Sequence, residues 1–524
     1  MFEKENKNNK NDSNVEVNVV EPKKVQIVDI EYDLAGCGPK ILGVTNQYAL
    51  EQKVSVDKKT IFESAEEFYK YFEDYKKQIN NLRAFEIIDI SYSILNQEND
   101  INHVKIHVKL KDSIHILAVP YLKYDSNKGF TFKLKAKDTN FLGSLNSMST
   151  DLNFAIENNE ELGTKKTIIG FNFNYDYPFS LGLFNSTWVN DFEFSYAIGE
   201  KIPEWYAKTG LKLELPKDDY SYLFEVYQYS IHDTDYIDFN DEYYFSEEAK
   251  FSVPITLAKL DTLGKIIYKP YTSFIFNWDF NHINETNSDL SSPTFTLGHT
   301  LNLGKTDWIG NFRRGISLSL LNSYNYNIQR NDFYPKVSLE MNAFYNLEFF
   351  EGNYFNKLGL CNYLYMFHYF NLEQNKFSYN EKIGAKLRGI RDEQYFSPES
   401  GVSSLQACNT SSAIVLNLDF PYHIFSTNFT KSFLRYFNFD LQISPFIDIA
   451  LVNNKATQKT FDLKDGFYAA GFEVLVYPQK WSSFTVRGSL GIDIGRTLLK
   501  DYINTQWRDN VSKYEISFGV GLHY

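Results

Sequence analysis

Large apolar side chains alternate with polar ones over most of the chain, from about residue 119 to the C-terminus. In residues 129–138, "GFTFKLKAKD", one face carries Phe, Leu and Ala, and the opposite face carries Thr and three Lys. The same alternation recurs in segments 169–178, 273–280 and 513–524. A period of two residues is typical of β-strands whose two faces meet different environments.

The chemistry of the two faces distinguishes two β-rich folds. A soluble sandwich would bury the apolar face, but so many large rings would overfill its core, and the polar residues of the other face suit a wet lumen. Strands that are apolar outside and polar inside describe a transmembrane β-barrel, whose closure leaves no unpaired backbone in lipid. With strands of about 9–11 residues, residues 119–524 predict a barrel of about sixteen strands. A soluble multi-sheet protein is the alternative.

A different pattern precedes the barrel region. Residues 25–34, 88–94 and 104–110 alternate like half-buried strands. Between the first two, residues 61–82 place apolar side chains at spacings of three and four, which is one stripe of an amphipathic helix. A small sheet covered by a helix makes an α+β unit, so we expect a separate domain at residues 23–118.

Composition supports a membrane barrel. The chain of 524 residues has 45 Phe and 38 Tyr but only 4 Met, and outer-membrane barrels place aromatic residues at the membrane interfaces. No run of about 18 apolar residues predicts a membrane-spanning helix. The net charge of -13 argues against a nucleic-acid partner, which would require a basic face.

The first residues, 1–22, are polar and rich in Asn, and we expect a disordered tail there. They lack the apolar segment of a secretory signal. Either a signal is missing from this sequence or the protein does not use one.

One long connection stands out among the late strand segments. Residues 373–411 form a loop of about forty residues, a length typical of functional loops. It contains "LRGI", which comprises Leu387, Arg388, Gly389 and Ile390. Arg388 brings a fixed positive charge and Gly389 permits close approach of the backbone.

These segments resemble the bacterial surface antigen superfamily of BamA- and TamA-like outer-membrane barrels. That family carries an aliphatic-Arg-Gly-aromatic motif in the sixth long loop of a sixteen-stranded barrel, and Ile390 here replaces the aromatic. "SPFIDIALV" is similar to the family's Phe-x-Asp-x-Gly strand, with Phe446 and Asp448 matching and Ala450 in place of Gly. The resemblance implies that residues 23–118 form one POTRA-like periplasmic domain.

Strand alternation predicts partners for the arginine. In residues 441–451 the aliphatic residues share one side, which turns Asp448 to the lumen. In residues 412–421 the same reasoning turns Asp419 inward. A guanidinium inserted with the loop would meet these carboxylates in a bidentate geometry. We therefore expect Arg388 to pair with Asp448 and Asp419 and to fix the position of the loop.

The resemblance also implies a lateral gate where the first and last barrel strands meet. We expect residues 128–138 to meet residues 512–524 at this seam. The gate residues would be Phe130, Lys133, Lys135, Gly519, Gly521 and Tyr524. Glycine weakens a strand interior, so Gly519 and Gly521 suit a strand that opens.

The implied function is insertion, assembly or translocation of proteins at the bacterial outer membrane. Substrate strands would add to the edge of the POTRA-like sheet and then enter the opened seam. The expected partners are unfolded outer-membrane or secreted proteins and the lipid bilayer, with accessory lipoproteins as possible additions. A passive porin, a two-partner-type secretion transporter and a mitochondrial sorting-and-assembly barrel are the alternatives.

Motifs for catalysis are missing from the sequence. It contains no HExxH, no phosphate-binding glycine loop and no GxSxG. Cys37, Cys361 and Cys408 lie far apart and form no CxxC pair. We expect neither an enzyme nor a cofactor or metal site.

Overall fold

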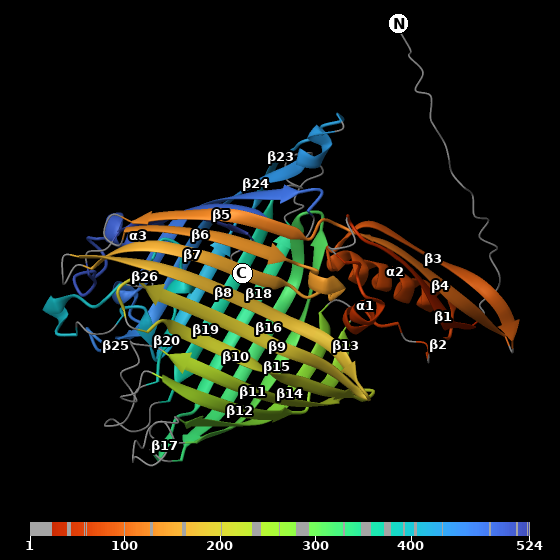
Figure 1. The fold of residues 1–524 in the computed structure, drawn as a ribbon, viewed down its shortest axis with the longest axis horizontal. Helices are drawn as coiled ribbons and strands as arrows, with labels where there is room; N and C mark the ends of the chain where they lie inside the picture. The colour runs from red at the N-terminus through yellow and green to blue at the C-terminus, as the bar shows by residue number, and fades with distance from the viewer. Residues whose placement is uncertain are drawn as a thin grey trace, which may run out of the picture.

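The computed structural model shows a β-barrel with a smaller domain at one rim (Figure 1). The structure describes residues 24–522 except 39–42, 57, 59, 99, 126–128, 160–163, 201, 233–242, 261–262, 279–292, 329–330, 347–357, 371–378, 391–393, 403–405, 432, 482–483, 510–511 and 521.

The small domain is an α+β unit, as expected. Its elements are β1 (Lys24–Ala35), α1 (Gln47–Lys53), β2 (Ile61–Phe62), α2 (Ala65–Asn81), β3 (Phe85–Glu98) and β4 (Ile101–Asp112). The sheet order is β2-β1-β4-β3, so β3 forms an edge of the sheet. The short helix α1 was not expected from the sequence.

Local signals explain where α2 begins and which side it buries. Ser64 caps the helix by accepting a hydrogen bond from the backbone N–H of Glu67 at 3.2 Å, and the Glu67 carboxylate accepts from the N–H of Glu63 at 3.0 Å. The predicted apolar stripe is buried from Phe68 to Ile79 inside the domain core, but its expected start at residue 61 was wrong, because Ile61 lies in β2 and is 40% exposed. The helix therefore covers one face of the sheet.

The barrel strands follow one another around the wall. They are β5 (Ile116–Asp125), β6 (Gly129–Asp138), β7 (Met148–Asn159), β8 (Thr164–Leu181), β9 (Phe184–Ala197), β10 (Glu204–Pro216), β11 (Ser221–His232), β12 (Tyr243–Ser252), β13 (Ile255–Leu260), β14 (Gly264–Trp278), β15 (Thr294–Ile309), β16 (Phe312–Asn327), β17 (Asp332–Phe333), β18 (Lys336–Asn346), β19 (Gly359–Tyr369), β22 (Ser412–Asp419), β23 (Tyr422–Ser426), β24 (Phe439–Asn454), β25 (Lys459–Thr460), β26 (Phe467–Pro478), β27 (Val486–Asp493) and β28 (Tyr514–Val520).

Four of these labels continue a neighbouring strand after a break. β13 continues β12, β18 continues β17, β23 continues β22 and β26 continues β25, because both members of each pair meet the same partner strand. The described residues therefore make eighteen passages through the wall, compared with the expectation of about sixteen.

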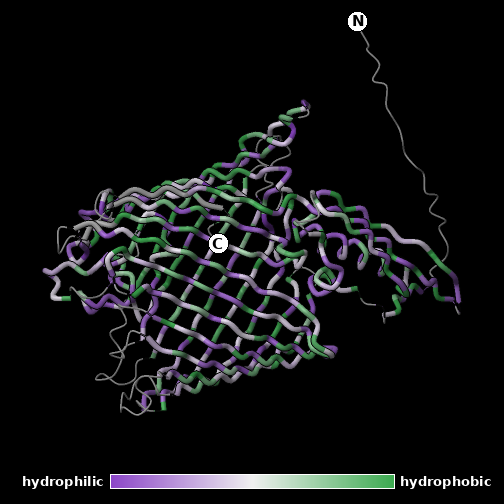
Figure 2. Tube along the Cα trace, in the orientation of Figure 1, coloured by the Kyte–Doolittle hydropathy of each residue, from purple (hydrophilic) through white to green (hydrophobic). Residues whose placement is uncertain are grey.

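The alternation of faces matches the expectation for a transmembrane barrel. Ile447 is 40% exposed on the outer face of β24, whereas its neighbour Asp448 is fully buried inside. On β28, Ile516 and Phe518 are likewise exposed. Figure 2 shows hydrophobic and hydrophilic positions alternating along the strands. Among the described helices, none has the length and hydrophobicity needed to cross a membrane.

The first strand of the barrel differs from the expectation. The barrel begins with β5 at Ile116, three residues before the predicted boundary at residue 119, and β6 pairs with β5 on one side and β7 on the other. The expectation that residues 128–138 meet the last strand was therefore wrong. β5 contains Pro120 and lacks clear alternation of apolar and polar residues, so its sequence does not predict a strand.

The seam lies between β5 and β28, which are neighbours in the strand order. Ladders of paired residues join the other neighbouring long strands, for example β26 to β27 and β27 to β28. Within the part of the chain that the structure describes, no such ladder joins β28 to β5. Among the described residues, the seam is therefore the least extensively paired junction between neighbouring long strands.

The α+β domain is fixed to the rim at several turns. Lys305 near the β15–β16 turn contacts Asp74 of α2 at 2.7 Å, and Lys480 after β26 pairs with Glu86 of β3. The Arg83 guanidinium lies 4.2 Å from the ring centroid of Trp308 and donates to the Asn311 side chain at 2.9 Å. Contacts on separate turns hold the domain in one orientation at the rim of the barrel.

Candidate functional site: the lumen loop and its carboxylates

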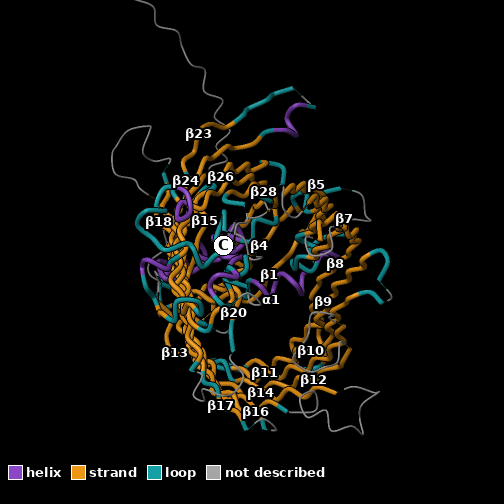
Figure 3. Tube along the Cα trace, turned by 90° about the vertical axis from the view of Figure 1, so that its left-hand side faces the viewer, coloured by secondary structure: helices purple, strands orange, loops and turns teal. Residues whose placement is uncertain are grey.

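The connection between β19 and β22 folds into the barrel. It contains β20 (Glu381–Lys382), the 3-10 turns η4 (Gly384–Lys386) and η5 (Pro398–Ser400), and β21 (Asn409–Thr410). Figure 3, which looks along the barrel, shows β20 inside the ring of strands. Its apolar residues pack with the inner wall in one cluster of buried side chains: Phe367, Ile383, Leu387, Ile390, Phe396, Ala407, Cys408, Ala413, Val415, Ala450, Val452, Phe467, Ala469 and Trp507.

Arg388 is the polar centre of this loop and is 6% exposed. Its Nε and Nη2 atoms donate to the two carboxylate oxygens of Asp448 at 3.0 and 2.6 Å. Its Nη1 and Nη2 atoms donate to Asp419 at 2.6 and 3.3 Å. The backbone N–H of Arg388 also donates to Asp448 at 2.8 Å. Both predicted carboxylates are thus bound in the forked geometry that guanidinium favours.

A third carboxylate and an aromatic ring complete the surroundings of the guanidinium. The Glu473 carboxylate of β26 lies 3.3 Å from Nη1 of Arg388 and 3.5 Å from the Arg487 guanidinium. The guanidinium carbon lies 3.7 Å from the ring centroid of Phe446, which favours attraction between the charge and the ring. The ring has space because Gly471 is opposite it: a Cβ there would lie 2.6 Å from the Phe446 ring.

Gly389 lets the loop backbone touch the wall. Its φ is +82°, a left-handed conformation that disfavours other residues, and a Cβ would lie 2.5 Å from the carbonyl carbon of Gly491 on β27. Its N–H donates to the Glu515 carboxylate of β28 at 3.3 Å. The loop therefore contacts the last strand as well as β22, β24 and β26.

A second buried ionic cluster holds the far part of the loop. The connection between β27 and β28 supplies Arg496 and Arg508, which both bind Asp493, and Arg508 also donates to Gln394 of the loop at 2.9 Å. The backbone N–H of Tyr395 donates to Asp509 at 3.0 Å. The lumen loop and this connection thus form one packed unit at the rim opposite the α+β domain (Figure 1).

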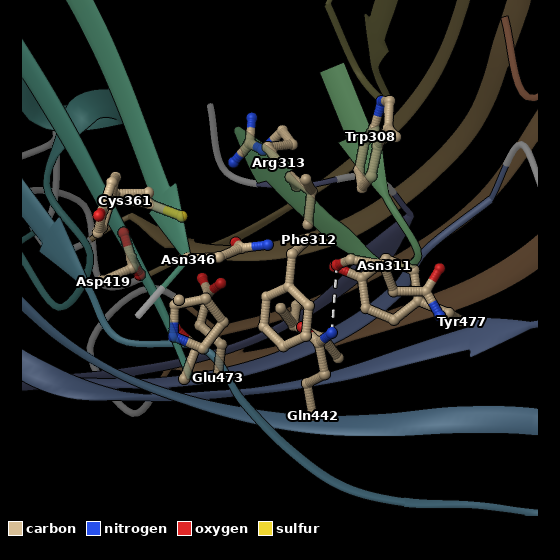
Figure 4. A pocket seen from close by; sticks show the side chains of 16 residues that line it. Trp308, Asn311, Phe312, Arg313, Asn346, Cys361, Asp419, Gln442, Glu473 and Tyr477 are labelled. Atoms are coloured by element: carbon tan, nitrogen blue, oxygen red, sulfur yellow. Dashed lines mark hydrogen bonds between the residues drawn. The ribbon is translucent and has the colours of Figure 1, made fainter. Parts of the chain in front are cut away.

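Next to the arginine site, the lumen contains a cavity of about 40 Å³. The β15–β16 turn supplies Trp308, Phe312 and Arg313, and the opposite wall supplies Asp419 and Glu473, so two carboxylates of the arginine site also face this cavity (Figure 4). Gln442 of the wall donates to the Asn311 carbonyl at 3.2 Å. A space of this size holds only a few water molecules, so this part of the lumen is nearly filled.

The predicted residues meet different outcomes. Leu387, Arg388, Gly389, Ile390, Asp419 and Asp448 come together, and they lie in the lumen as expected. Lys133 and Lys135 lie on the second barrel strand, away from the seam, as does the backbone of Phe130. Gly519 is in β28, opposite Arg487 of β27. Gly521 and Tyr524 lie outside the described residues.

Sequence reasoning missed three contributors: Glu473, Gly491 and Glu515. The alternation of "FYAAGFEVLVYP" does place Glu473 on the face of Ala469 and Gly471. A charged residue on a strand face that carries small residues was therefore a signal from which Glu473 could have been predicted. The contacts of Gly491 and Glu515 depend on the path of the loop, which no local pattern encodes.

The arrangement is suited to holding a segment in place. The described residues contain no group of three or more His, Cys, Asp and Glu side chains arranged to hold a metal ion. The ionic groups of the site bind one another across the loop and the three strands. The site therefore acts as a clamp between the loop and β22, β24 and β26.

No protein-family model and no curated protein matches the chain. Solved structures similar to it include BamA from Haemophilus ducreyi lacking POTRA domains 1–3, at 12% identity and a TM-score of 0.38, covering 95% of this chain and 85% of that one. CdiB from Acinetobacter baumannii is 12% identical with a TM-score of 0.43, covering 94% and 74%. CdiB from Escherichia coli is 8% identical with a TM-score of 0.48, covering 94% and 76%.

Proposed function

We propose that the protein inserts or transports other proteins at the bacterial outer membrane, with a lateral gate at the β5–β28 seam. The observation that carries this proposal is the clamp formed by Arg388, which binds carboxylates on β22, β24 and β26, whereas β28 contacts the loop through the hydrogen bond from Gly389 to Glu515. A barrel braced so close to its weakest junction is suited to opening there.

The α+β domain would act as a POTRA-like docking domain in the periplasm. β3 is an edge strand of its sheet, and an added strand can bind such an edge through main-chain hydrogen bonds with little dependence on sequence. The domain sits at the rim nearest the β5 start, because β4 ends at Asp112 and β5 begins at Ile116. A bound substrate strand would be held near the seam.

Disulfide locking of the seam tests the gate. Cysteine pairs, one in residues 116–120 of β5 and one in residues 514–520 of β28, are introduced after Cys37, Cys361 and Cys408 are replaced by Ser. We expect a fully oxidised pair to stop function and reduction to restore it. Undiminished growth of cells that carry only a fully locked protein would contradict the gate.

A matched lock elsewhere in the wall provides the control. Lys135 of β6 lies directly opposite Asp151 of β7 in an existing ladder. A disulfide between Lys135→Cys and Asp151→Cys joins strands that already remain paired, so function should survive. Loss of function in this control would show that oxidation itself is harmful.

Depletion separates the two forms of the function. Loss of many barrel proteins from the outer-membrane proteome indicates assembly, and loss of one secreted product indicates transport. Deletion of residues 24–112 separates both from a passive porin, because a pore would keep its conductance and its cellular role without the domain. Accessory lipoproteins would be identified by co-purification with the full chain.

A further inference from the structure

A hairpin of unusual composition projects from the rim that carries the α+β domain. It comprises β23, the turn η6 (Leu434–Phe437) and the start of β24. In Figure 1 it rises beyond the barrel wall, and in Figure 3 its strands and turn lie outside the ring. The two views agree that the hairpin extends outward from the barrel wall.

The hairpin exposes large apolar side chains along its length. Phe433 is 72% exposed and Phe437 is 53% exposed, and their ring centroids lie 5.3 Å apart. Further exposed residues of the same kind are Ile424, Phe425, Phe429, Leu434 and Tyr436. An exposed group of this size indicates a surface that another phase or molecule covers.

The charge of the hairpin is opposite to that of the whole protein. Residues 421–439, "PYHIFSTNFTKSFLRYFNF", contain Lys431 and Arg435 but no Asp or Glu, in a chain with a net charge of -13. Both basic residues are exposed. Aromatic rings next to basic side chains are typical of segments that lie in the interface of an anionic membrane.

Local hydrogen bonds hold the hairpin in this position. The Asn438 side chain accepts from the N–H of Phe429 at 2.7 Å. The Thr427 hydroxyl accepts from the N–H of Phe439 at 2.8 Å, and Gln479 of the next turn donates to the Asn438 carbonyl at 2.9 Å. Because its base is bonded to the barrel, the tip is presented at a defined level near the rim.

We propose that residues 424–431 and 433–437 form a membrane anchor whose rings enter the bilayer interface and whose Lys431 and Arg435 bind anionic phospholipid headgroups. The occupant is the lipid of the membrane that the barrel spans, since the exposed rings continue the outer apolar face of β24, where Ile447 is also exposed. The anchor would fix the tilt and depth of the barrel next to the clamped strands β22 and β24.

Spin labelling of the full chain in nanodiscs tests this anchor. A nitroxide at Phe433→Cys is compared with one at Glu73→Cys on α2, a water-exposed position of the α+β domain, both after replacement of the native cysteines by Ser. In discs of phosphatidylcholine mixed with phosphatidylglycerol, we expect the ratio of oxygen to nickel-chelate accessibility to be several-fold higher at 433 than at 73. Equal ratios would overturn the proposal and indicate water or a soluble partner.

The charges are tested in the same discs. Lys431→Gln combined with Arg435→Gln should lower the inserted fraction in anionic discs, by roughly fivefold in the inserted-to-exposed ratio for each neutralised charge, with a smaller change in pure phosphatidylcholine. An identical change in both lipids would overturn the role of the headgroups.

A second measurement covers the case in which the cysteine-free protein does not fold. Benzoylphenylalanine in place of Phe433, with native cysteines kept, should crosslink to phospholipid in cell envelopes. Crosslinks to protein alone would contradict a lipid occupant.

Discussion

Two walls of the same barrel treat charged side chains in opposite ways. On the wall formed by β22, β24 and β26, Arg388 and Asp448 are 6% and 0% exposed and lie 2.6 Å apart. On the wall formed by β8 and β10, Lys212 and Asp176 are 36% and 38% exposed and lie 3.7 Å apart. The lumen loop covers the first wall, so the same barrel offers a desolvated ion cluster and a hydrated one.

The difference shows that position in a lumen does not decide the strength of an ion pair. Exposed pairs contribute about 0–1 kcal/mol because water screens them. Breaking a buried pair leaves an uncompensated charge and costs about 3–5 kcal/mol. The loop therefore creates a structural element from residues that would otherwise resemble other lumen charges.

The largest effect is expected from Arg388→Ala. It leaves Asp448, Asp419 and Glu473 buried without their shared cation, so we expect unfolding to become easier by about 3–5 kcal/mol. Urea titration followed by the gel-mobility difference between folded and unfolded barrels measures it. Arg388→Lys keeps the positive charge but loses the bidentate geometry of the guanidinium. Its loss of stability should therefore lie between zero and that of Arg388→Ala. A loss of stability no larger than that of an exposed ion pair, about 0–1 kcal/mol, would show that the loop is not docked.

A reciprocal charge swap, Arg388→Asp with Asp448→Arg, tests the clamp by the same urea titration. Arg388→Asp would place a new carboxylate beside Asp419 and Glu473, which remain unchanged. We therefore expect the double variant to regain little stability, because repulsion among three acids replaces the original attraction.

The next effect concerns the contact between loop and wall. Gly389→Ala combines a left-handed φ with a Cβ only 2.5 Å from Gly491, for an expected cost of roughly 2–4 kcal/mol. Gly401→Ala is the matched control, because its φ is +73° but nothing lies within 4 Å of the added Cβ. It should cost only about 1–2 kcal/mol. Equal costs in the two variants, measured by the same titration, would argue against a close approach.

The junction between domain and barrel should respond more weakly. Arg83→Ala removes the contact with the Trp308 ring and a hydrogen bond to Asn311, for an expected loss of about 1–3 kcal/mol. Limited proteolysis between Asp112 and Ile116 reports release of the domain. Lys76→Ala on α2, a half-buried residue that contacts Phe72 and Glu73 of its own helix, serves as control. Equal cleavage of both variants would exclude a special role for Arg83.

Acid should loosen the same junction. Burial alone would raise the pKa of Glu86, but Lys480 lowers it below its ordinary value of 4.5, and Lys305 likewise lowers the pKa of Asp74. Because both folded-state pKa values are depressed, their stabilisation is fully present above the ordinary pKa and is lost as the pH falls through the folded-state values. Proteolysis by an acid-active protease should accelerate below about pH 4.5, and Glu86→Gln should flatten that dependence.

The smallest effect is expected on the uncovered wall. Lys212→Ala removes one exposed pair and should change stability by about 0–1 kcal/mol. Raising the salt concentration should reduce even this difference. A loss as large as that of Arg388→Ala would remove the distinction between the two walls.

Much of the fold was readable because it depends on local periodicity. The stripe of α2 and the alternation of β24 each repeat along a single segment, so they predict the helix, the strand and the inward side of Asp448. The pairing with Arg388 was accessible because the loop motif and the acidic strand each carry a recognisable pattern. A wall of about sixteen strands was close to the eighteen passages of the described residues.

The seam was not readable because it is a relation between distant segments. β5 has Pro120 in its interior, and proline, which lacks an N–H donor, is confined to edge strands, strand starts and bulges. Pro120 therefore explains both why the alternation pattern does not predict β5 and why β5 suits the least paired junction. Glu515 and Gly491 were hidden for a similar reason, since their roles arise only once the loop is folded.

The position of the clamp sets the size of any opening. Arg388 binds carboxylates on β22, β24 and β26, and only β27 and β28 separate β26 from β5. Neighbouring strands are about 4.8 Å apart, so two hinged strands free a slot roughly 10 Å wide. In the proposed gate, that width would admit one β-hairpin at a time.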